Sequence, residues 1–362
     1  MNIAVLGAGN GGLTMAAHLT LLGHAVCLYD KYEEAVSAFM DTKRITLEGI
    51  LGTHTVTLMK VTTSLPEAIK GTEIVMIVTP AYAHRELAEQ LSSLLDPQVP
   101  VVLHPGRTGG ALEFRHVVSS SKKKNCPPIA EAQTLLYACR KTGPMKVSLY
   151  GIKHEVDFAV LPAVETNRVG RTLCTLFPQF KAVSSVLETS LLNIGAIFHP
   201  APTILNAGWI ETTKGNFQHY REGISPSVAK VLEALDAERM EVAERLGIIT
   251  KSALSWLMNV YGVEGKDLYT AIQSNKVYRG ILAPPSLDSR YISEDVPMSL
   301  VPLAELARLV GVETPTMDAV ITLANIMHGK DYRKEGRTLE RLGLAGRSVE
   351  EVKKFVREGD AT

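Results

Sequence analysis

Short apolar runs alternate with stretches that repeat apolar residues at helical spacing in the first half of the chain. Each run has the length of a buried strand, and each stretch fits a helix with one apolar face. The predicted strands are Ile3–Leu6, Ala25–Tyr29, short strands within Ile45–Leu58, Glu73–Val78, Val99–Leu103, one within Pro127–Cys139, one or two within Val147–Val164, and Phe180–Val183. The predicted helices are Leu13–Leu22, Tyr32–Met40, Ser64–Ile69, His84–Leu95 and Arg168–Phe177. Strands that alternate with helices predict a doubly wound parallel sheet.

The pattern changes near residue 185, after which only helical periodicities remain. The predicted helices are Val186–Ile197, Ser227–Leu246, Ser252–Tyr261, Asp267–Ser274, Leu300–Val310, one from Thr316 to His328, and a short one within Leu339–Glu358, and Ile281–Pro297 is predicted as a polar loop. We therefore expect an α/β fold in two domains. A Rossmann-type doubly wound parallel sheet domain spans 1–185, and an all-α C-terminal domain spans 186–362, with the active site in the cleft between them.

Glycines follow the first predicted strand in the pattern G-x-G-x-x-G, at Gly7, Gly9 and Gly12. A helix and a second strand come next, and Asp30 ends that strand 18 residues after Gly12. This order is typical of a dinucleotide-binding unit, in which the helix N-terminus receives the pyrophosphate and the acid binds the ribose hydroxyls. The alternatives are a purely structural glycine turn and, for Asp30, a loop acid in solvent.

The candidate cofactor is NAD, with NADP as the alternative. An acid at position 30 repels a 2′-phosphate and so favours NAD, although Lys31 beside it weakens this argument. The predicted cofactor-binding residues lie in the glycine turn and at the ends of the second predicted strand and of the strand that closes at Val78: Gly7, Ala8, Gly9, Asn10, Gly11, Gly12, Asp30, Thr79 and Pro80.

Charge and cysteine content exclude several classes of partner. Lys+Arg and Asp+Glu are equal at 38 each, so no net charge draws the chain to nucleic acid or to a membrane. The four cysteines lack metal-ligand spacing, and we expect no metal. Because the first strand starts at the N-terminus and no apolar run reaches the ~20 residues of a membrane span, we expect a cytoplasmic protein without a signal peptide. The expected partners are small-molecule substrates, and the apolar helices of the second half either close a core or form a homodimer.

Hydride transfer requires a protein group that moves a proton, and His199 is the candidate. It ends an apolar helix and precedes Pro200 and Pro202, so its backbone is constrained. Its orienting carboxylate is predicted to be Asp295, one of several eligible acids. The alternatives are a structural histidine and a solvated loop acid.

Three motifs besides the glycine pattern carry a resemblance to a known family. They are His199-Pro200, Tyr220-Arg221-Glu222-Gly223, and the segment from Arg290-Tyr291 to Glu294-Asp295-Val296-Pro297. With them, nearly the whole chain resembles the opine dehydrogenase family, which includes octopine and nopaline dehydrogenases and a bacterial N-(1-carboxyethyl)norvaline dehydrogenase. The resemblance implies an NAD(P)H-dependent reductive condensation, in which the amine of an amino acid and the carbonyl of a 2-oxo acid such as pyruvate form an imine that hydride reduces.

The resemblance also implies site residues. The catalytic histidine and aspartate of the family fall on His199 and Asp295. Thr134 matches a position that contacts the oxo acid, although Leu136 stands where the family often has proline. The remaining candidates for substrate binding are Arg107, Asn193, Asn206 and Arg290. Arg107 and Arg290 either bind substrate carboxylates or pair with neighbouring residues, and Tyr220 and Glu222 are expected to shape the cleft.

Two other functions compete with this interpretation. Dehydrogenases of the glycerol-3-phosphate, 6-phosphogluconate and 2-oxopantoate group share the first domain but use a lysine as acid–base, for which Lys214 is the nominee. An NAD(H) sensor without turnover is the other alternative, and it would not need both His199 and Asp295.

Overall fold

The first apolar run forms β1 (Asn2–Leu6), which lies inside an eight-stranded sheet of the computed structural model. The model describes residues 1–120 and 126–359. The strand order is β12-β11-β8-β7-β6-β1-β2-β5, and the six strands from β8 to β5 are mutually parallel. The predicted parallel sheet is therefore confirmed for these six strands. At one edge β11 pairs antiparallel with β8, and β12 pairs parallel with β11, so these two strands run in the opposite direction.

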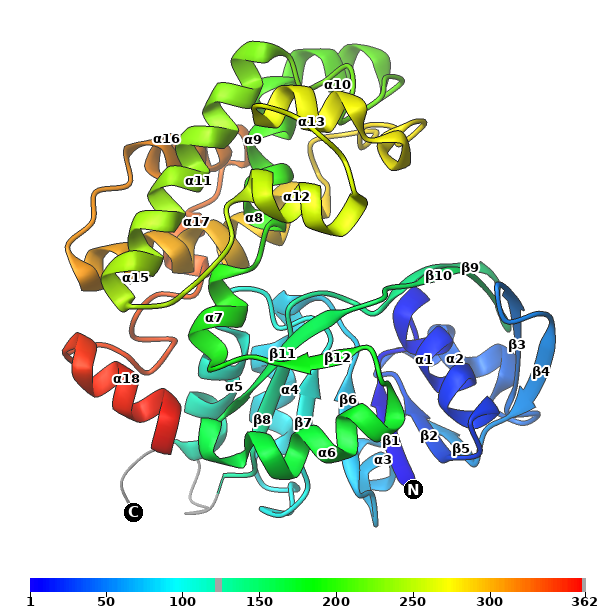
Figure 1. Cartoon of the computed structure of the whole chain (residues 1–362). Coiled ribbons are helices and arrows are strands. Elements are labelled where there is room, and N and C mark those ends of the chain that lie inside the picture. The colour runs from blue at the N-terminus through cyan, green and yellow to red at the C-terminus, as the bar shows by residue number, and fades with distance from the viewer. Residues whose placement is uncertain (121–125, 360–362) are drawn as a thin grey trace. The chain divides into compact units, whose positions relative to one another are not determined.

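The other strands of this sheet are β2 (Ala25–Tyr29), β5 (Lys60–Thr62), β6 (Ile74–Ile77), β7 (Val101–Leu103), β8 (Ile129–Ala132), β11 (Val156–Leu161) and β12 (Phe180–Ala182). The helices that connect them are α1 (Asn10–Leu21), α2 (Glu33–Val36), α3 (Leu65–Ile69), α4 (His84–Leu91), α5 (Gly110–Ser119) and α6 (Thr166–Leu176). Figure 1 labels these elements and colours them by residue number.

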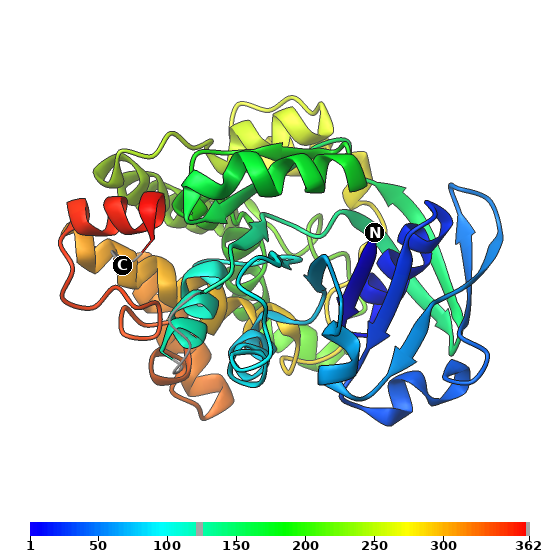
Figure 2. The same cartoon turned by 90° about the horizontal axis from the view of Figure 1, so that it is seen from below.

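A second, smaller sheet was not predicted. Its order is β4-β3-β10-β9, with β3 (Arg44–Gly49), β4 (His54–Thr57), β9 (Tyr137–Gly143) and β10 (Lys146–Ile152). The hairpin of β9 and β10 reaches past α1 to pair with β3 (Figures 1 and 2). The apolar pattern indicated β3, β4 and β10 but not β9, which extends beyond the single strand predicted within Pro127–Cys139. It could not show which sheet the strands join, because pairing depends on residues far apart in the chain.

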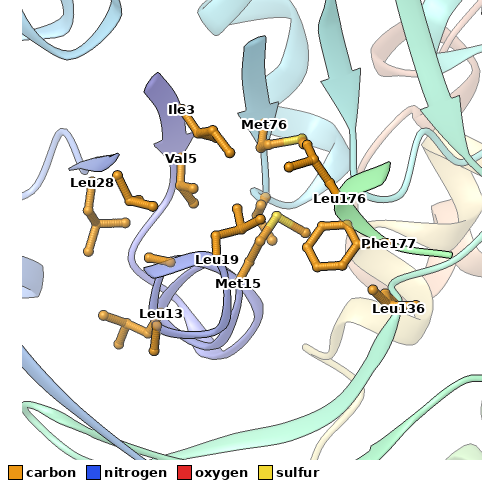
Figure 3. Packing of buried hydrophobic residues seen from close by; sticks show 14 of the residues in the cluster. Ile3, Val5, Leu13, Met15, Leu19, Leu28, Met76, Leu136, Leu176 and Phe177 are labelled. Atoms are coloured by element: carbon orange, nitrogen blue, oxygen red, sulfur yellow. The ribbon is translucent and has the colours of Figure 1, made fainter. Parts of the chain in front are cut away.

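The core of the first unit forms around α1, which is buried on nearly all sides from Gly11 to Leu19. Such a helix carries apolar residues all round rather than on one face. Figure 3 shows side chains of α1 packed against side chains of the sheet and of α6. The labelled residues of this cluster are Ile3, Val5, Leu13, Met15, Leu19, Leu28, Met76, Leu136, Leu176 and Phe177. Burial of this cluster holds α1 against the end of β1.

The second unit is helical. It contains α8 (Gly195–Phe198), α9 (Pro200–Leu205), α10 (Ala207–Thr213), α11 (Pro226–Leu246), α12 (Ala253–Tyr261), α13 (Leu268–Ser274), α14 (Arg290–Ser293), α15 (Val301–Val310), α16 (Pro315–His328) and α17 (Tyr332–Glu335). The long helix α11 starts where Ser225 accepts a hydrogen bond from the Val228 N–H at 3.3 Å. Inside the unit, the fully buried Arg239 pairs with Asp236 at 2.6 Å and donates to the carbonyl oxygens of Leu191 and Lys251.

Two predicted elements of the second half were wrong. The single helix expected over Val186–Ile197 is divided into α7 (Val186–Leu191) and α8, because the chain turns at Asn193, whose side chain donates to Ser299. The loop expected over Ile281–Pro297 contains α14, and a π-helical turn over Val296–Leu300 follows it. The prolines of this segment had favoured a loop. Pro297, however, lies in the first turn of the π-helical element, where the missing backbone N–H of proline costs little.

The structure divides the chain between Thr189 and Ser190, and it assigns the described end of the chain from Lys353 to the first unit. The sequence predicted a boundary at 185 and placed the whole remainder in the second domain. The difference arises at α18 (Val349–Glu358), which buries Val352, Phe355 and Val356 on one face. No helix among the described residues is both long and apolar enough to cross a membrane.

Phe177 provides a test of the first core. Its ring is 1% exposed and lies 5.7–6.2 Å from the rings of His18, Tyr137 and Phe180. We expect Phe177→Ala to lower the free energy of unfolding by about 3–5 kcal/mol, because it removes a buried ring and leaves a cavity. Urea unfolding followed by circular dichroism measures the change. Tyr150→Ala, at a ring 61% exposed, is the matched control and should change stability by less than about 0.5 kcal/mol. Equal effects of the two substitutions would contradict this account of the core.

Candidate active site

The glycine turn after β1 brings the start of α1 close to the strand. Gly7 has φ +110°, which side chains rarely adopt, and a Cβ there would lie 2.7 Å from the Val78 carbonyl oxygen. A Cβ on Gly12 would lie 1.7 Å from the Gly7 carbonyl oxygen. A Cβ on Gly9 would meet no described atom within 4 Å. Gly7 and Gly12 therefore serve close packing, whereas Gly9 faces open space at the helix N-terminus.

The N-terminus of α1 has features of an anion site. Its cap residue Gly9 has no side chain that could accept a hydrogen bond from the first N–H groups of the helix. The side chain of Asn10 turns away from the helix and accepts from the Lys141 N–H at 2.9 Å. Leu135 packs 3.0 Å from the position of a Cβ on Gly11. The first N–H groups of a helix and the positive end of its dipole suit a pyrophosphate.

Asp30 ends β2 beside this turn. One carboxylate oxygen accepts from the Ala8 N–H at 2.7 Å, and the other accepts from the Tyr32 N–H at 3.0 Å. These bonds fix the carboxylate at the C-terminal end of β2. Lys31 does not neutralise Asp30, because its ammonium donates to both carboxylate oxygens of Glu86, at 2.8 and 3.0 Å.

A cavity of about 210 Å³ lies next to Asp30 in the first unit. Its lining includes Gly7, Asp30, Thr79 and Pro80. The hydroxyl oxygen of Thr79 is buried and has no hydrogen-bond partner among the described residues. The open space at Gly9, the carboxylate and this hydroxyl fit a dinucleotide, which would supply the missing hydrogen-bond partner. The structure thus brings the predicted cofactor residues to one place.

Two predicted substrate residues follow the neighbouring strands β7 and β8. Arg107 lies after β7 with φ +61°, and the nearby Gly106 N–H donates to the Ala132 carbonyl at 3.1 Å. Thr134 lies after β8, and its hydroxyl accepts from Lys153 at 2.7 Å. Because these strands are parallel to β6 and β1, Arg107 and Thr134 share the edge that carries Thr79 and Gly7.

In the second unit, His199 and Asp295 form a hydrogen-bonded pair. The His199 Nδ1 atom lies 2.9 Å from Asp295 Oδ2, although 96 residues separate the two in sequence. His199 stands at the junction of α8 and α9, directly before Pro200, and Asp295 precedes the π-helical turn. The side chain of Asp295 is 1% exposed and that of His199 is 21% exposed, so the imidazole remains accessible above a buried carboxylate.

A chain of polar groups supports Asp295 from behind. Ser299 donates to Asp295 Oδ1 at 3.4 Å, and Asn193 donates to the Ser299 hydroxyl at 2.9 Å. Asn193 is 3% exposed. In this structure Asn193 therefore lies behind the pair, and Ser299 and Asp295 stand between it and His199. The sequence pattern did not indicate Ser299. It follows Asp295 by four residues, and such a spacing brings two side chains together only in a helix, whereas the sequence predicted a loop as far as Pro297.

Aromatic rings surround His199. The ring of Tyr291 stacks on it with centroids 4.3 Å apart and an angle of 13°, and His219 lies 5.1 Å from Tyr291. Burial lowers the pKa of His219 to about 4, with a further contribution from the nearby His199. His219 is consequently neutral at physiological pH. Burial raises the pKa of Tyr220 well above its ordinary value, so this phenol also stays neutral.

The other candidates of the second unit make local contacts. Arg290 forms an ion pair with the buried Glu294 at 2.5 Å while its own side chain remains 58% exposed. Asn206 donates both amide hydrogens to backbone carbonyls, those of Pro202 and Gly223, at 2.7 and 2.8 Å. Glu222 accepts from the Gln218 N–H at 2.6 Å. Lys214 ends α10 with φ +52° and lacks an apolar setting.

A dinucleotide turn on a parallel sheet, followed in the chain by a helical unit with an accessible histidine braced by an aspartate, defines the class of two-domain NAD(P)-linked dehydrogenases. Two family models match the chain. The model described as NAD/NADP octopine/nopaline dehydrogenase, alpha-helical domain, matches residues 182–328. The model of the NAD-dependent glycerol-3-phosphate dehydrogenase N-terminus matches residues 2–106.

Known proteins show similarity over nearly the whole chain. An opine dehydrogenase of Arthrobacter sp. (strain 1C) is 40% identical over 98% of this chain and 98% of its own length. An octopine dehydrogenase of Pecten maximus is 25% identical over 93% of this chain and 92% of its own. A solved structure of an octopine dehydrogenase with NADH and L-arginine has a TM-score of 0.83 at 21% identity, and covers 100% of this chain and 99% of that one.

This chain belongs to the opine dehydrogenase family. It is an NAD(P)-dependent oxidoreductase that acts on the CH–NH group of donors. The predicted family, fold class and enzyme class are confirmed. Similarity to the glycerol-3-phosphate group is limited in the family models to residues 2–106, which explains why the first half alone left that group open.

Gly9 tests the cofactor site separately from folding. We expect Gly9→Ala to weaken NADH binding at least about tenfold, because the new methyl group would stand where the pyrophosphate approaches the helix N-terminus. The melting temperature without cofactor should change little, since the methyl group meets no described atom. NADH fluorescence titration measures the binding. Gly208→Ala, at an equally open helical glycine of α10, is the control and should leave affinity unchanged. Unaltered binding by Gly9→Ala would rule out this placement of the pyrophosphate.

Proposed function

We propose that this chain reduces the imine formed from a 2-oxo acid, with pyruvate the first choice, and the amino group of an amino acid. The product is a secondary amine dicarboxylate. The observation that carries the proposal is the hydrogen bond of 2.9 Å between His199 and the buried Asp295. Solved octopine dehydrogenase structures contain NADH together with L-arginine or with pyruvate, which supports this pair of substrate classes.

The reaction balances as two steps. The amine adds to the carbonyl carbon and water leaves, which forms the imine. NADH, when bound, supplies a hydride to the imine carbon, and one proton completes the secondary amine. His199 is proposed to donate the proton that lets the carbonyl oxygen leave as water and to accept protons from the attacking amine.

Asp295 orients this imidazole. Its carboxylate faces Nδ1, so that the other ring nitrogen, Nε2, is directed toward substrate, and it stabilises the positive charge of the protonated ring. Ser299 and Asn193 are positioning residues that hold the carboxylate through its second oxygen. Tyr291 restricts rotation of the imidazole by stacking on its face.

The substrates present two carboxylates that need cationic or hydrogen-bonding partners. We assign the oxo-acid carboxylate to Thr134 and Arg107 of the first unit. The exposed guanidinium of Arg290 is assigned to the carboxylate of the amino acid, where Glu294 holds one side of the guanidinium in place. Asn206 is proposed to fix the local backbone rather than to donate to substrate, because its amide hydrogens are engaged by backbone carbonyls.

NAD is proposed as the preferred cofactor over NADP. Asp30 is fixed by two backbone N–H groups at the end of β2, where it would bind ribose hydroxyls and repel a 2′-phosphate. The adjacent Lys31 forms an ion pair with Glu86, so its ammonium is already engaged and does not favour the 2′-phosphate of NADP. A cytoplasmic location is proposed as well, because the four cysteines are scattered along the sequence. A homodimer is proposed on the exposed apolar residues of α16.

A coupled assay tests the function directly. NADH or NADPH is mixed with pyruvate and a panel of amino acids, and absorbance at the nicotinamide band is followed. We expect oxidation only when an oxo acid and an amine are both present, with NADH used in preference to NADPH. Oxidation with the oxo acid alone would instead indicate a 2-hydroxy acid dehydrogenase.

The His199–Asp295 pair is tested by substitution. We expect His199→Ala to lower the turnover rate by about 10²–10⁴-fold, because general acid–base catalysis is lost, while NADH binding persists. Asp295→Asn should also slow turnover, because it removes the charge that stabilises the imidazolium. His116→Ala, in α5, is the control and should retain activity. Retention of full turnover by both site variants would exclude the pair from catalysis and would fit a binding protein instead.

A further inference from the structure

Lys153 lies beside the proposed oxo-acid site, although no sequence motif selects it. It follows β10, where its backbone N–H donates to the Leu136 carbonyl at 3.0 Å. Its ammonium donates to the Thr134 hydroxyl at 2.7 Å and to the Leu135 carbonyl at 2.9 Å. Three bonds therefore tie Lys153 to the segment that follows β8.

This segment borders the cofactor turn. Leu135 lies 3.0 Å from the position of a Cβ on Gly11, in the first turn of α1. Thr134 follows the C-terminal end of β8, and the Gln133 N–H next to it donates to the Asp157 carbonyl of the antiparallel strand β11 at 2.8 Å. Lys153 thus reaches the carboxyl edge of the parallel strands from the antiparallel side of the sheet.

The ammonium of Lys153 has neutral partners. An ammonium has three hydrogen-bond donors, and the described residues provide it with two neutral oxygen acceptors. Arg107 is close enough to affect its titration, and the residue as a whole remains exposed. Loss of water around the ammonium, and then the charge of Arg107, lower the pKa of Lys153 to about 8, so it is still positive at neutral pH.

We propose that Lys153 binds the carboxylate of the 2-oxo acid and orients the Thr134 hydroxyl toward it. With Arg107, it brings two positive charges to one edge of the sheet, which favours a small anion there. Because Thr134 accepts from Lys153, its own hydroxyl hydrogen is left to donate to the substrate. Lys153 is thus a specificity residue for the oxo acid.

Hydride transfer indicates that the carboxylate near Lys153 belongs to the oxo acid rather than to the amino acid. The imine carbon that receives the hydride derives from the oxo acid, and it must lie against the nicotinamide ring. The carboxylate is bonded directly to that carbon, so it must lie near the strand ends that border the cofactor. The amino-acid carboxylate is two bonds farther from the imine carbon. This inference rests on the proposed function.

The test measures KM for each substrate and kcat separately in variants of Lys153. In Lys153→Met the KM for pyruvate should rise about 10–100-fold, as expected for loss of one charged hydrogen bond, while the KM for the amino acid and the affinity for NADH change less than about threefold. Lys153→Arg should recover most of the loss because it keeps the charge. Lys181→Met, at an exposed lysine paired with Glu155, is the control and should match the wild type.

Three outcomes would overturn the inference. An unchanged KM for pyruvate would exclude the contact, and an equal rise in the KM for the amino acid would indicate general damage to the site. Turnover slowed by about a hundredfold or more at unchanged KM would make Lys153 an acid–base group instead. If Lys153→Met fails to bind NADH, Lys153→Gln repeats the measurement. Failure of the proposed function is distinguishable, because the wild type would then not couple pyruvate and amine to NADH oxidation.

Discussion

Six neighbouring strands that run in one direction are the constraint on which the first unit depends. Since parallel strands place their carboxyl ends at the same edge, Gly7, Thr79, Arg107 and Thr134 come from distant parts of the chain to one line. Burial of α1 on nearly all sides holds the glycine turn at this edge, and the contact of Gly12 with Gly7 leaves no room for a larger residue. The antiparallel strand β11 then brings Lys153 to the same edge from the opposite direction.

The second unit holds one accessible imidazole at a fixed angle. The ring of His199 is exposed enough to meet a substrate, while its partner Asp295 is buried. A buried carboxylate is costly unless hydrogen bonds satisfy it, and His199 and Ser299 each engage one of its oxygens. The neutral His219 behind Tyr291 adds no second proton carrier at physiological pH.

The sequence was most informative where function depends on backbone shape. The glycine spacing located the dinucleotide turn, and Asp30 was placed by its distance from that turn. His199 was nominated by its place at the end of an apolar helix before Pro200, and Asp295 was one of several eligible acids. Resemblance to the opine dehydrogenases then favoured both, because a single histidine or loop acid carries little local signal. Ser299 and Lys153 were missed for the same reason, since each acts through a partner that only folding brings near.

The sequence by itself determined the alternation of strands and helices in the first half, the glycine turn and the division into an α/β half and a helical half, because apolar periodicity and glycine conformation act locally. Tertiary structure alone decided the second sheet, the break at Asn193 and the helical form of the segment before Asp295. It also decided the pairing of His199 with Asp295 across 96 residues and the contact of Lys153 with Thr134. Such contacts depend on how elements distant in sequence pack, and a local pattern does not record that.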